Sequence, residues 1–341
     1  MIILVKKYPW LWALAISLLI LLATGCSKDN ITGTISYGKV SPDSREFLLD
    51  YYDLGKSNII EQVNLGPIFG RSIFIDNTTD TIWVPAAYTS DLSEISNMVK
   101  IINKKVTEIK VGLSPVDIQF NQNIAAITCL ERGFNDVTTY FVNTHDFRML
   151  GKLQIGGDNF QFSDLDKDNG ILYSITQDVD HKVSILSTID IASQKLINQF
   201  KYENTPLSGI KFVNNELWIC GGNKLINVDQ KTGEKIETIE IDSIARQIVS
   251  DGQRLIISHY YPDSQEQKGL TVLNLNNRTV KRIDIKDVLP SSIILDGHNI
   301  YIVDEMAGTL SVYDMRTSKI ISTYSLGQYP TNIVLSHLEG L

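Results

Sequence analysis

The side chains of this 341-residue chain that could perform acid–base, nucleophilic or metal chemistry are spread thinly along the sequence. The sequence contains no G-x-S-x-G nucleophile elbow, no H-E-x-x-H zinc motif and no glycine-rich phosphate-binding fingerprint. Five histidines stand far apart, namely His145, His181, His259, His298 and His337. No local motif therefore predicts a catalytic residue.

One acidic cluster has the beginning of a calcium-binding loop. Asp164, Asp166 and Asp168 occupy positions one, three and five of such a loop, which supply carboxylate ligands. The glycine falls at position seven instead of six, and Ile175 stands where the loop requires a bidentate glutamate. We therefore interpret the segment as a solvated hairpin between two strands. The alternative is a weak calcium site, and the sequence predicts no other metal or cofactor.

Three cysteines cannot form a disulfide framework. None of them lies in a C-x-x-C pair or at the spacing of a zinc site. Cys129 and Cys220 lie inside apolar, strand-like runs. We expect both to be buried free thiols rather than partners in a bridge.

A sequence repeat organises the elements that must position these residues. In the clearest copy, strand-like runs occupy residues 299–304, 309–314, 319–327 and 329–335. Each run alternates in polarity or is short and apolar, which predicts β-strands of about five residues and no helix. Equivalent runs recur every 38 to 47 residues, with anchors at Ile82, Ala125, Leu172, Leu217, Leu255 and Ile300. This spacing is typical of one propeller blade.

The two ends of the chain each supply part of one more repeat. Residues 47–53 and 59–66 match third and fourth strands with no first strand before them, whereas residues 331–336 match a first strand with nothing after it. We therefore expect an all-β, seven-bladed β-propeller whose ring is closed by strands from both ends. Its inner strands are expected near residues 72–75, 115–120, 160–162, 208–213, 247–250, 292–295 and 331–335.

Two motifs carry a resemblance to a known family. One is a strand that begins with Leu or Ile and an aromatic residue, as at residues 172–173, 217–218 and 300–301; the other is Gly-x-x-Pro, at residues 112–115 and 327–330. Over about residues 34–336 the chain resembles the YVTN-repeat β-propellers, which are similar to the quinoprotein-like and lactonase-like propellers. No copy reads Tyr-Val-Thr-Asn in full. WD40 propellers fit less well, because no Trp-Asp dipeptide is present.

The resemblance implies that loops between second and third strands share a face with the connectors between repeats. The second strands are expected to end at Ala86, Cys129, Thr176, Gly221, His259 and Asp304. Long loops on a rigid scaffold often carry function, and the longest on this face are expected at residues 87–97 and 259–269. We predict a binding face that includes His259, Tyr260, Tyr261 and Asp304, whose aromatic rings could anchor a partner or stack on a sugar. The alternatives are tyrosines packed over their own blade and a solvated histidine and aspartate.

The first thirty residues have the pattern of an export signal. Lys6 and Lys7 precede an apolar stretch at residues 10–23, which is short for a membrane span. Residues 22–26, Leu-Ala-Thr-Gly-Cys, resemble a bacterial lipobox, which implies cleavage before Cys26 and a diacylglyceryl thioether on its sulfur. We expect a signal peptide at residues 1–25, a lipidated tether at 26–33 and the propeller at 34–341. A plain secretory signal and an uncleaved anchor helix are the alternatives.

Composition and charge narrow the classes of partner. With 43% hydrophobic and 21% charged residues the chain can form a large core, and a formal charge of −8 argues against a nucleic-acid partner. We predict an extracytoplasmic lipoprotein at the cell membrane or outer membrane, with a noncatalytic propeller that binds a protein or glycan. The alternatives are a lactonase-like or quinoprotein-like enzyme acting at the mouth of the channel, and a chaperone or complex subunit without a small ligand.

Overall fold

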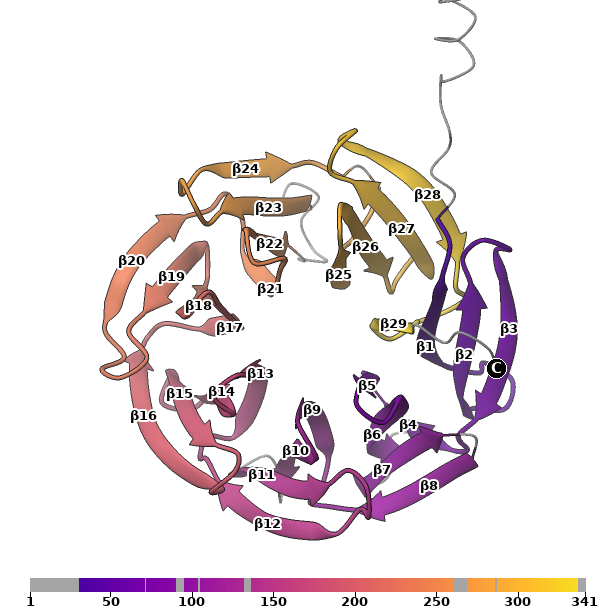
Figure 1. The fold of residues 1–341 in the computed structure, drawn as a ribbon, viewed down its shortest axis with the longest axis horizontal. Coiled ribbons are helices and arrows are strands. Elements are labelled where there is room, and N and C mark those ends of the chain that lie inside the picture. Colours follow the sequence, from indigo (N-terminus) through magenta and orange to yellow (C-terminus); the bar gives the residue numbers. More distant parts are fainter. Residues whose placement is uncertain are drawn as a thin grey trace, which may run out of the picture.

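The computed structural model describes residues 31–70, 72–89, 95–103, 105–131, 136–259, 269–285 and 287–336. Within these ranges, 29 strands form seven sheets that are arranged in a ring (Figure 1). The expected seven-bladed β-propeller is thereby confirmed. None of the described residues belongs to a helix long and apolar enough to cross a membrane.

The ring closes through strands from both ends of the described chain. Blade 1 consists of β29 (Ile333–Ser336), β1 (Thr34–Val40), β2 (Phe47–Asp53) and β3 (Asn58–Asn64). β1 pairs antiparallel with β29, so that Thr34 lies opposite Ser336. The shared blade is confirmed, but its second strand, β1, was not foreseen. Gly38 and Lys39 interrupt the apolar pattern of this strand, and Gly38 is required there because a Cβ would collide with the ring of Phe47.

The next three blades follow in chain order. Blade 2 contains β4 (Ile68–Phe69), β5 (Phe74–Asp76), β6 (Thr81–Thr89), β7 (Ile95–Asn103) and β8 (Lys105–Lys110). Blade 3 contains β9 (Pro115–Asn121), β10 (Ile124–Glu131), β11 (Asp136–Asn143) and β12 (Met149–Gln154). Blade 4 contains β13 (Asn159–Asp166), β14 (Ile171–Asp178), β15 (Val183–Asp190) and β16 (Lys195–Glu203).

The last three blades repeat the same antiparallel order. Blade 5 contains β17 (Leu207–Val213), β18 (Glu216–Gly221), β19 (Lys224–Val228) and β20 (Lys235–Glu240). Blade 6 contains β21 (Ala245–Ser250), β22 (Arg254–His259), β23 (Gly269–Asn274) and β24 (Val280–Ile283). Blade 7 contains β25 (Ser292–Asp296), β26 (Asn299–Asp304), β27 (Thr309–Asp314) and β28 (Lys319–Ser325).

The register of the second strands was predicted in part. β18, β22 and β26 end at Gly221, His259 and Asp304 as expected. In the earlier blades the prediction was wrong, because β6, β10 and β14 continue two or three residues beyond Ala86, Cys129 and Thr176. In β14, for example, pairing with β15 extends this strand to Asp178.

The hydrophobic core is divided into clusters that lie between neighbouring blades. Each of the seven clusters draws its side chains from two adjacent sheets. Trp83 of blade 2, for example, is fully buried against Ile118 and Ile127 of blade 3. Blades are therefore held to one another by the burial of apolar surface, which is the dominant stabilising term in folding.

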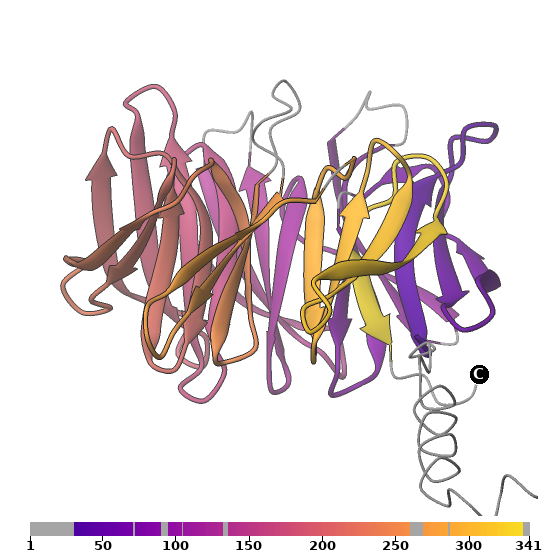
Figure 2. The same ribbon diagram turned by 90° about the horizontal axis from the view of Figure 1, so that it is seen from above.

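The antiparallel order gives the ring two distinct faces (Figure 2). We call the face with the loops between second and third strands and the connectors between blades the loop face. Its two kinds of loop are joined by backbone hydrogen bonds, such as the one from Ala245 N to Gly222 O at 3.1 Å. We call the opposite face, with hairpins between first and second strands and between third and fourth strands, the hairpin face.

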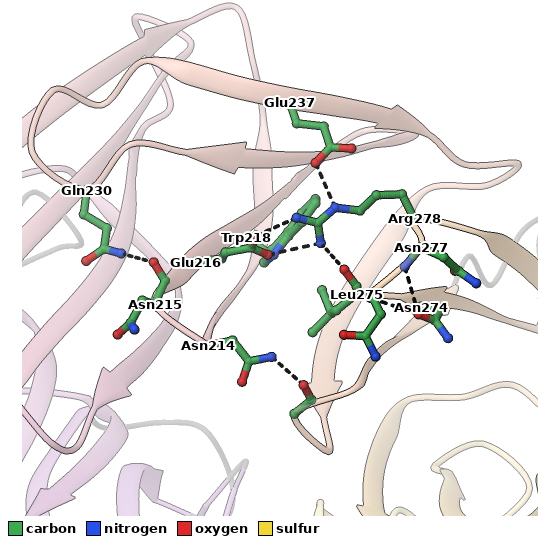
Figure 3. A network of polar contacts seen from close by, with 12 residues as sticks. Asn214, Asn215, Glu216, Trp218, Gln230, Glu237, Asn274, Leu275, Asn277 and Arg278 are labelled. Atoms are coloured by element: carbon green, nitrogen blue, oxygen red, sulfur yellow. Dashed lines mark hydrogen bonds and ion pairs between the residues drawn. The ribbon is translucent and has the colours of Figure 1, made fainter.

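A polar network between blades 5 and 6 lies on the hairpin face (Figure 3). Arg278, in the last hairpin of blade 6, contacts Glu216 at 2.5 Å and Glu237 at 3.3 Å, both in blade 5. Its guanidinium lies 5.1 Å from the centroid of the Trp218 ring, and the indole donates a 2.9 Å hydrogen bond to Glu216. This network ties the last hairpin of blade 6 to the second and fourth strands of blade 5.

Candidate functional site

His259 ends β22 at the loop face, but its side chain is only 1% exposed. The imidazole Nδ1 lies 3.1 Å from the carbonyl oxygen of Ile244, and Nε2 lies 2.7 Å from Oγ1 of Thr271. Burial lowers the pKa of His259 below its ordinary value, so the ring is neutral at pH 7. The side chain therefore holds the connector between blades 5 and 6 against blade 6.

Asp304 has the same kind of role in the next blade. Its carboxylate is 3% exposed and accepts hydrogen bonds from Ala307 N at 2.9 Å and Leu289 N at 2.8 Å. Asp304 thus holds its own loop and the connector from blade 6 to blade 7. It does not bond His259, whose partners are Ile244 and Thr271. The interpretation of both residues as solvated side chains is wrong. Tyr260 and Tyr261, the other two residues of the predicted binding face, lie outside the described residues.

The loop that Asp304 positions presents an apolar side chain to solvent. Met306 is 62% exposed at the tip of this loop. Two residues later, the carbonyl oxygen of Gly308 accepts a 2.8 Å hydrogen bond from Leu326 N, at the start of the connector from blade 7 to blade 1. A Cβ at Gly308 would collide with the carbonyl oxygen of Gly327, so glycine permits this close approach of the two backbones.

The connector carries a second exposed apolar side chain, Tyr329, at 60% exposure. We call Met306 and Tyr329 the loop-face pair. Tyr329 has φ of +49°, a left-handed conformation that is uncommon for bulky residues. Ser114 occupies the same position of the other Gly-x-x-Pro motif with φ of +46°, but is buried. The motif therefore sets the backbone in both copies, and the copy that follows blade 7 displays an aromatic ring at this position.

The sequence predicted Asp304 as part of the binding face but did not predict Met306 or Tyr329. A strand pattern shows where a loop begins, whereas the exposure of Met306 and Tyr329 depends on two loops packed backbone to backbone. The one available signal was the tyrosine in the Gly-x-x-Pro motif at residues 327–330, where the copy at 112–115 has serine.

Polar side chains connect the inner strands of blades 3, 4 and 5. Asp117 of β9 accepts a hydrogen bond from Ser163 of β13. The adjacent Asp164 accepts hydrogen bonds from Lys211 Nζ at 2.8 Å and from Phe212 N at 2.6 Å, both in β17. Burial raises the pKa of Asp117 to about 6. This inner cluster therefore contains a carboxyl group that can exchange a proton near neutral pH.

Lys211 supplies the cationic partner of one carboxylate in the acidic segment considered for calcium. Asp166 accepts hydrogen bonds from Asn169 N at 3.1 Å and Asn169 Nδ2 at 2.8 Å, which makes it a turn-forming residue. Asp168 is exposed. Across the described part of the chain, no three His, Cys, Asp or Glu side chains are grouped as a metal site requires.

Both cysteines of the described chain are buried and free, as expected. Burial raises the pKa of each thiol well above its ordinary value. These thiols are therefore protonated at pH 7 and contribute to the packing between blades.

Comparison with known proteins defines the class through the fold alone. No protein-family model and no curated protein sequence matches the chain. A functionally unknown protein from Desulfotomaculum acetoxidans is similar with a TM-score of 0.69 and 13% identity, covering 90% of this chain and 99% of that chain. A candidate 6-phosphogluconolactonase from Bacteroides fragilis has a TM-score of 0.61 and 12% identity, covering 91% and 99%. Apo AztD from Citrobacter koseri has a TM-score of 0.53 and 14% identity, covering 89% of this chain and 98% of that chain.

Proposed function

We propose that the chain is an extracytoplasmic lipoprotein that binds a protein or glycan partner through the loop face of a YVTN-like propeller. A lipid on Cys26 holds it at the cell membrane or outer membrane. The sequence of residues 1–26 supports the anchor through its two lysines, its short apolar stretch and its lipobox pattern. These residues lie outside the described ranges, so the anchor is tested by fatty-acid labelling of the protein.

The loop-face pair is the observation that carries the binding proposal. Met306 and Tyr329 expose about three fifths of their surface, on loops fixed by the buried carboxylate of Asp304 and by a backbone hydrogen bond. Ordering exposed side chains at an interface costs free energy, and a pre-organised loop lowers that cost. Tyrosine and methionine are enriched in protein interfaces, and tyrosine can also stack on a sugar ring.

The anchor is tested by metabolic labelling with a fatty-acid analogue. We expect the parent protein to be labelled and Cys26→Ser to be unlabelled, because the thiol is the attachment site. Cys129→Ser is the matched control and keeps the label, since that cysteine is buried in the propeller. Persistent labelling of Cys26→Ser would contradict the anchor.

The binding face is tested by photo-crosslinking in cells. A photoreactive phenylalanine at position 329 should give a defined product with a protein or glycan, and Met306→Ser should reduce its yield several-fold. Ile60 is the control position, because it is 47% exposed on the outer strand β3. If position 60 gives the same product, or position 329 gives none, the loop face is not the binding surface.

A lactonase-like enzyme is the second candidate function, and the inner cluster favours it. Asp117, with a pKa of about 6, can act as a general acid or base near neutral pH. One similar structure is described as a candidate 6-phosphogluconolactonase. Hydrolysis of 6-phosphogluconolactone and unphosphorylated lactones is the test, and Asp117→Asn should abolish any activity. Activity that survives this substitution excludes Asp117 as the catalytic group.

A further inference from the structure

The outermost strands of four blades begin with the same exposed pair of residues. The first member is a lysine, at Lys105, Lys195, Lys235 and Lys319. All four lysines are exposed, and none forms an ion pair with another residue that the structure describes. The second member is apolar and between 38% and 64% exposed, at Val106, Leu196, Ile236 and Ile320. We call these eight residues the hairpin belt.

The hairpin belt lies on one side of the ring. Each pair directly follows the hairpin between third and fourth strands, which places it at the start of an outer strand, toward the hairpin face (Figure 2). The aspartates that open three of these hairpins, Asp190, Asp229 and Asp314, are less exposed than the lysines, whereas Glu234 of blade 5 is exposed. Asp229, for example, accepts hydrogen bonds from the turn backbone at Lys231 N and Thr232 N, each at 2.8 Å.

The loop face has the opposite electrostatic character. Exposed carboxylates occupy its loops and connectors, including Asp180, Glu203, Asp242 and Asp284. The chain as a whole carries a formal charge of −8, so free lysines gathered toward one face give the propeller a charge polarity. A negatively charged surface is therefore attracted more strongly by the hairpin belt than by the loop face, where exposed carboxylates accompany exposed lysines such as Lys110 and Lys182.

The position of the N-terminal strand points to the same side. β1 begins at Thr34, which pairs with Ser336 at the end of an inner strand, and this end of the blade belongs to the hairpin face. Eight residue steps separate Cys26 from Thr34. A fully extended chain covers at most about 28 Å in eight steps. On the proposed function above, a lipid on Cys26 therefore keeps the hairpin face within that distance of the bilayer.

We propose that the hairpin belt docks on the anionic phospholipid surface of the membrane, with the loop face directed away from it. The lysine ammonium groups contact the phosphates, and the neighbouring apolar side chains enter the boundary between headgroups and acyl chains. Cationic and apolar side chains together are the composition that binds such an interface. This orientation leaves Met306 and Tyr329 accessible to a partner.

The test uses the chain from residue 27 onward, without lipid, because all seven blades are complete within residues 34–336. Vesicles of phosphatidylcholine with 30% phosphatidylglycerol are the probe, and co-sedimentation at low salt is the measurement. A lysine near such a surface contributes about fivefold to the partition coefficient. Lys195→Glu, Lys235→Glu and Lys319→Glu combined should therefore lower binding by at least about 100-fold.

The control changes three exposed lysines near the loop face by the same total charge, as Lys110→Glu, Lys182→Glu and Lys201→Glu combined. We expect it to lower binding less than about fivefold. Equal losses in the two triple variants, or no binding of the parent chain to anionic vesicles, would overturn the proposal. Fatty-acid labelling of Cys26 is measured separately, so failure of docking and failure of the anchor give different results.

Discussion

The two faces of the propeller are built on different principles. On the hairpin face, an Asp or Asn ends the third strand or directly follows it in six blades, and this side chain accepts hydrogen bonds from backbone N–H groups of the turn. The residues are Asp53, Asn143, Asp190, Asp229, Asn274 and Asp314. On the loop face, neighbouring blades use different residues for this purpose: a buried histidine in blade 6 and a buried aspartate in blade 7. The repeated Asp and Asn side chains therefore maintain the scaffold, whereas the proposed partner-binding residues Met306 and Tyr329 belong to loops that are particular to one blade.

Removal of β29 should have the largest effect, because it breaks the closure of the ring. Deletion from Tyr329 onward leaves the edge of β1 unpaired and removes Ile333 and Val334 from the clusters on either side of blade 1. We expect the whole ring to lose cooperative unfolding, measured by circular dichroism and limited proteolysis. Deletion of residues 337–341 alone is the control, since it retains β29. An unchanged melting temperature after the longer deletion would show that closure contributes little.

The fold could be predicted from the sequence because its determinants are local and repeated. Alternating strands and Asp or Asn turns recur with nearly constant spacing, so one clear copy identifies the others. β1 was missed because its residues depend on partners far along the chain: Tyr37 donates a hydrogen bond to the carbonyl oxygen of Leu326, and Gly38 N donates one to Oγ1 of Thr331. The roles of His259 and Asp304 were missed for the same reason, since their partners lie in connectors between blades.

The inner cluster around Asp117 lies on the inner strands of the ring, between the two faces. Asp117→Asn tests how the buried carboxyl group affects the free energy of unfolding. In the folded chain, burial raises the pKa of Asp117 to about 6, from an ordinary value of 3.8. The folded state therefore binds more protons than the unfolded state between these values, and stability falls as pH rises from about 4 to 6. The shift corresponds to about 2 to 3 kcal/mol.

Asp117→Asn should remove the fall in stability between pH 4 and pH 6. We expect the variant to be more stable than the parent by about 2 to 3 kcal/mol at pH 7 and equal to it near pH 4, because the parent carboxyl is protonated there. Urea unfolding at both pH values is the measurement. Equal stability differences at pH 4 and pH 7 would show that Asp117 does not titrate in this range. A gain in stability accompanied by a loss of lactonase activity would identify a functional site that costs stability.

The network between blades 5 and 6 tests whether hairpin-face contacts serve the scaffold. Arg278→Ala should lower the free energy of unfolding by about 1 to 2 kcal/mol, because Glu216 loses a two-pronged charged partner and Trp218 loses the cation above its ring. Adding Glu216→Gln should cost less in the Arg278→Ala background than in the parent. Strictly additive losses would contradict a coupled network. Partner capture at Tyr329 should be unaffected by either change.

Tyr329→Gly has the smallest expected effect on stability, and it separates partner binding at the loop face from support of the fold. Glycine accepts the left-handed backbone without the cost of a Cβ, about 1 kcal/mol, but increases the entropy of the unfolded chain. We therefore expect a gain of about 0.5 kcal/mol, whereas Tyr329→Ser retains the strained backbone and gives no gain. Both variants should lose partner capture, because each removes the exposed ring. If either variant destabilises the propeller by more than about 1 kcal/mol, the ring supports the fold. If both keep full capture, the partner binds elsewhere.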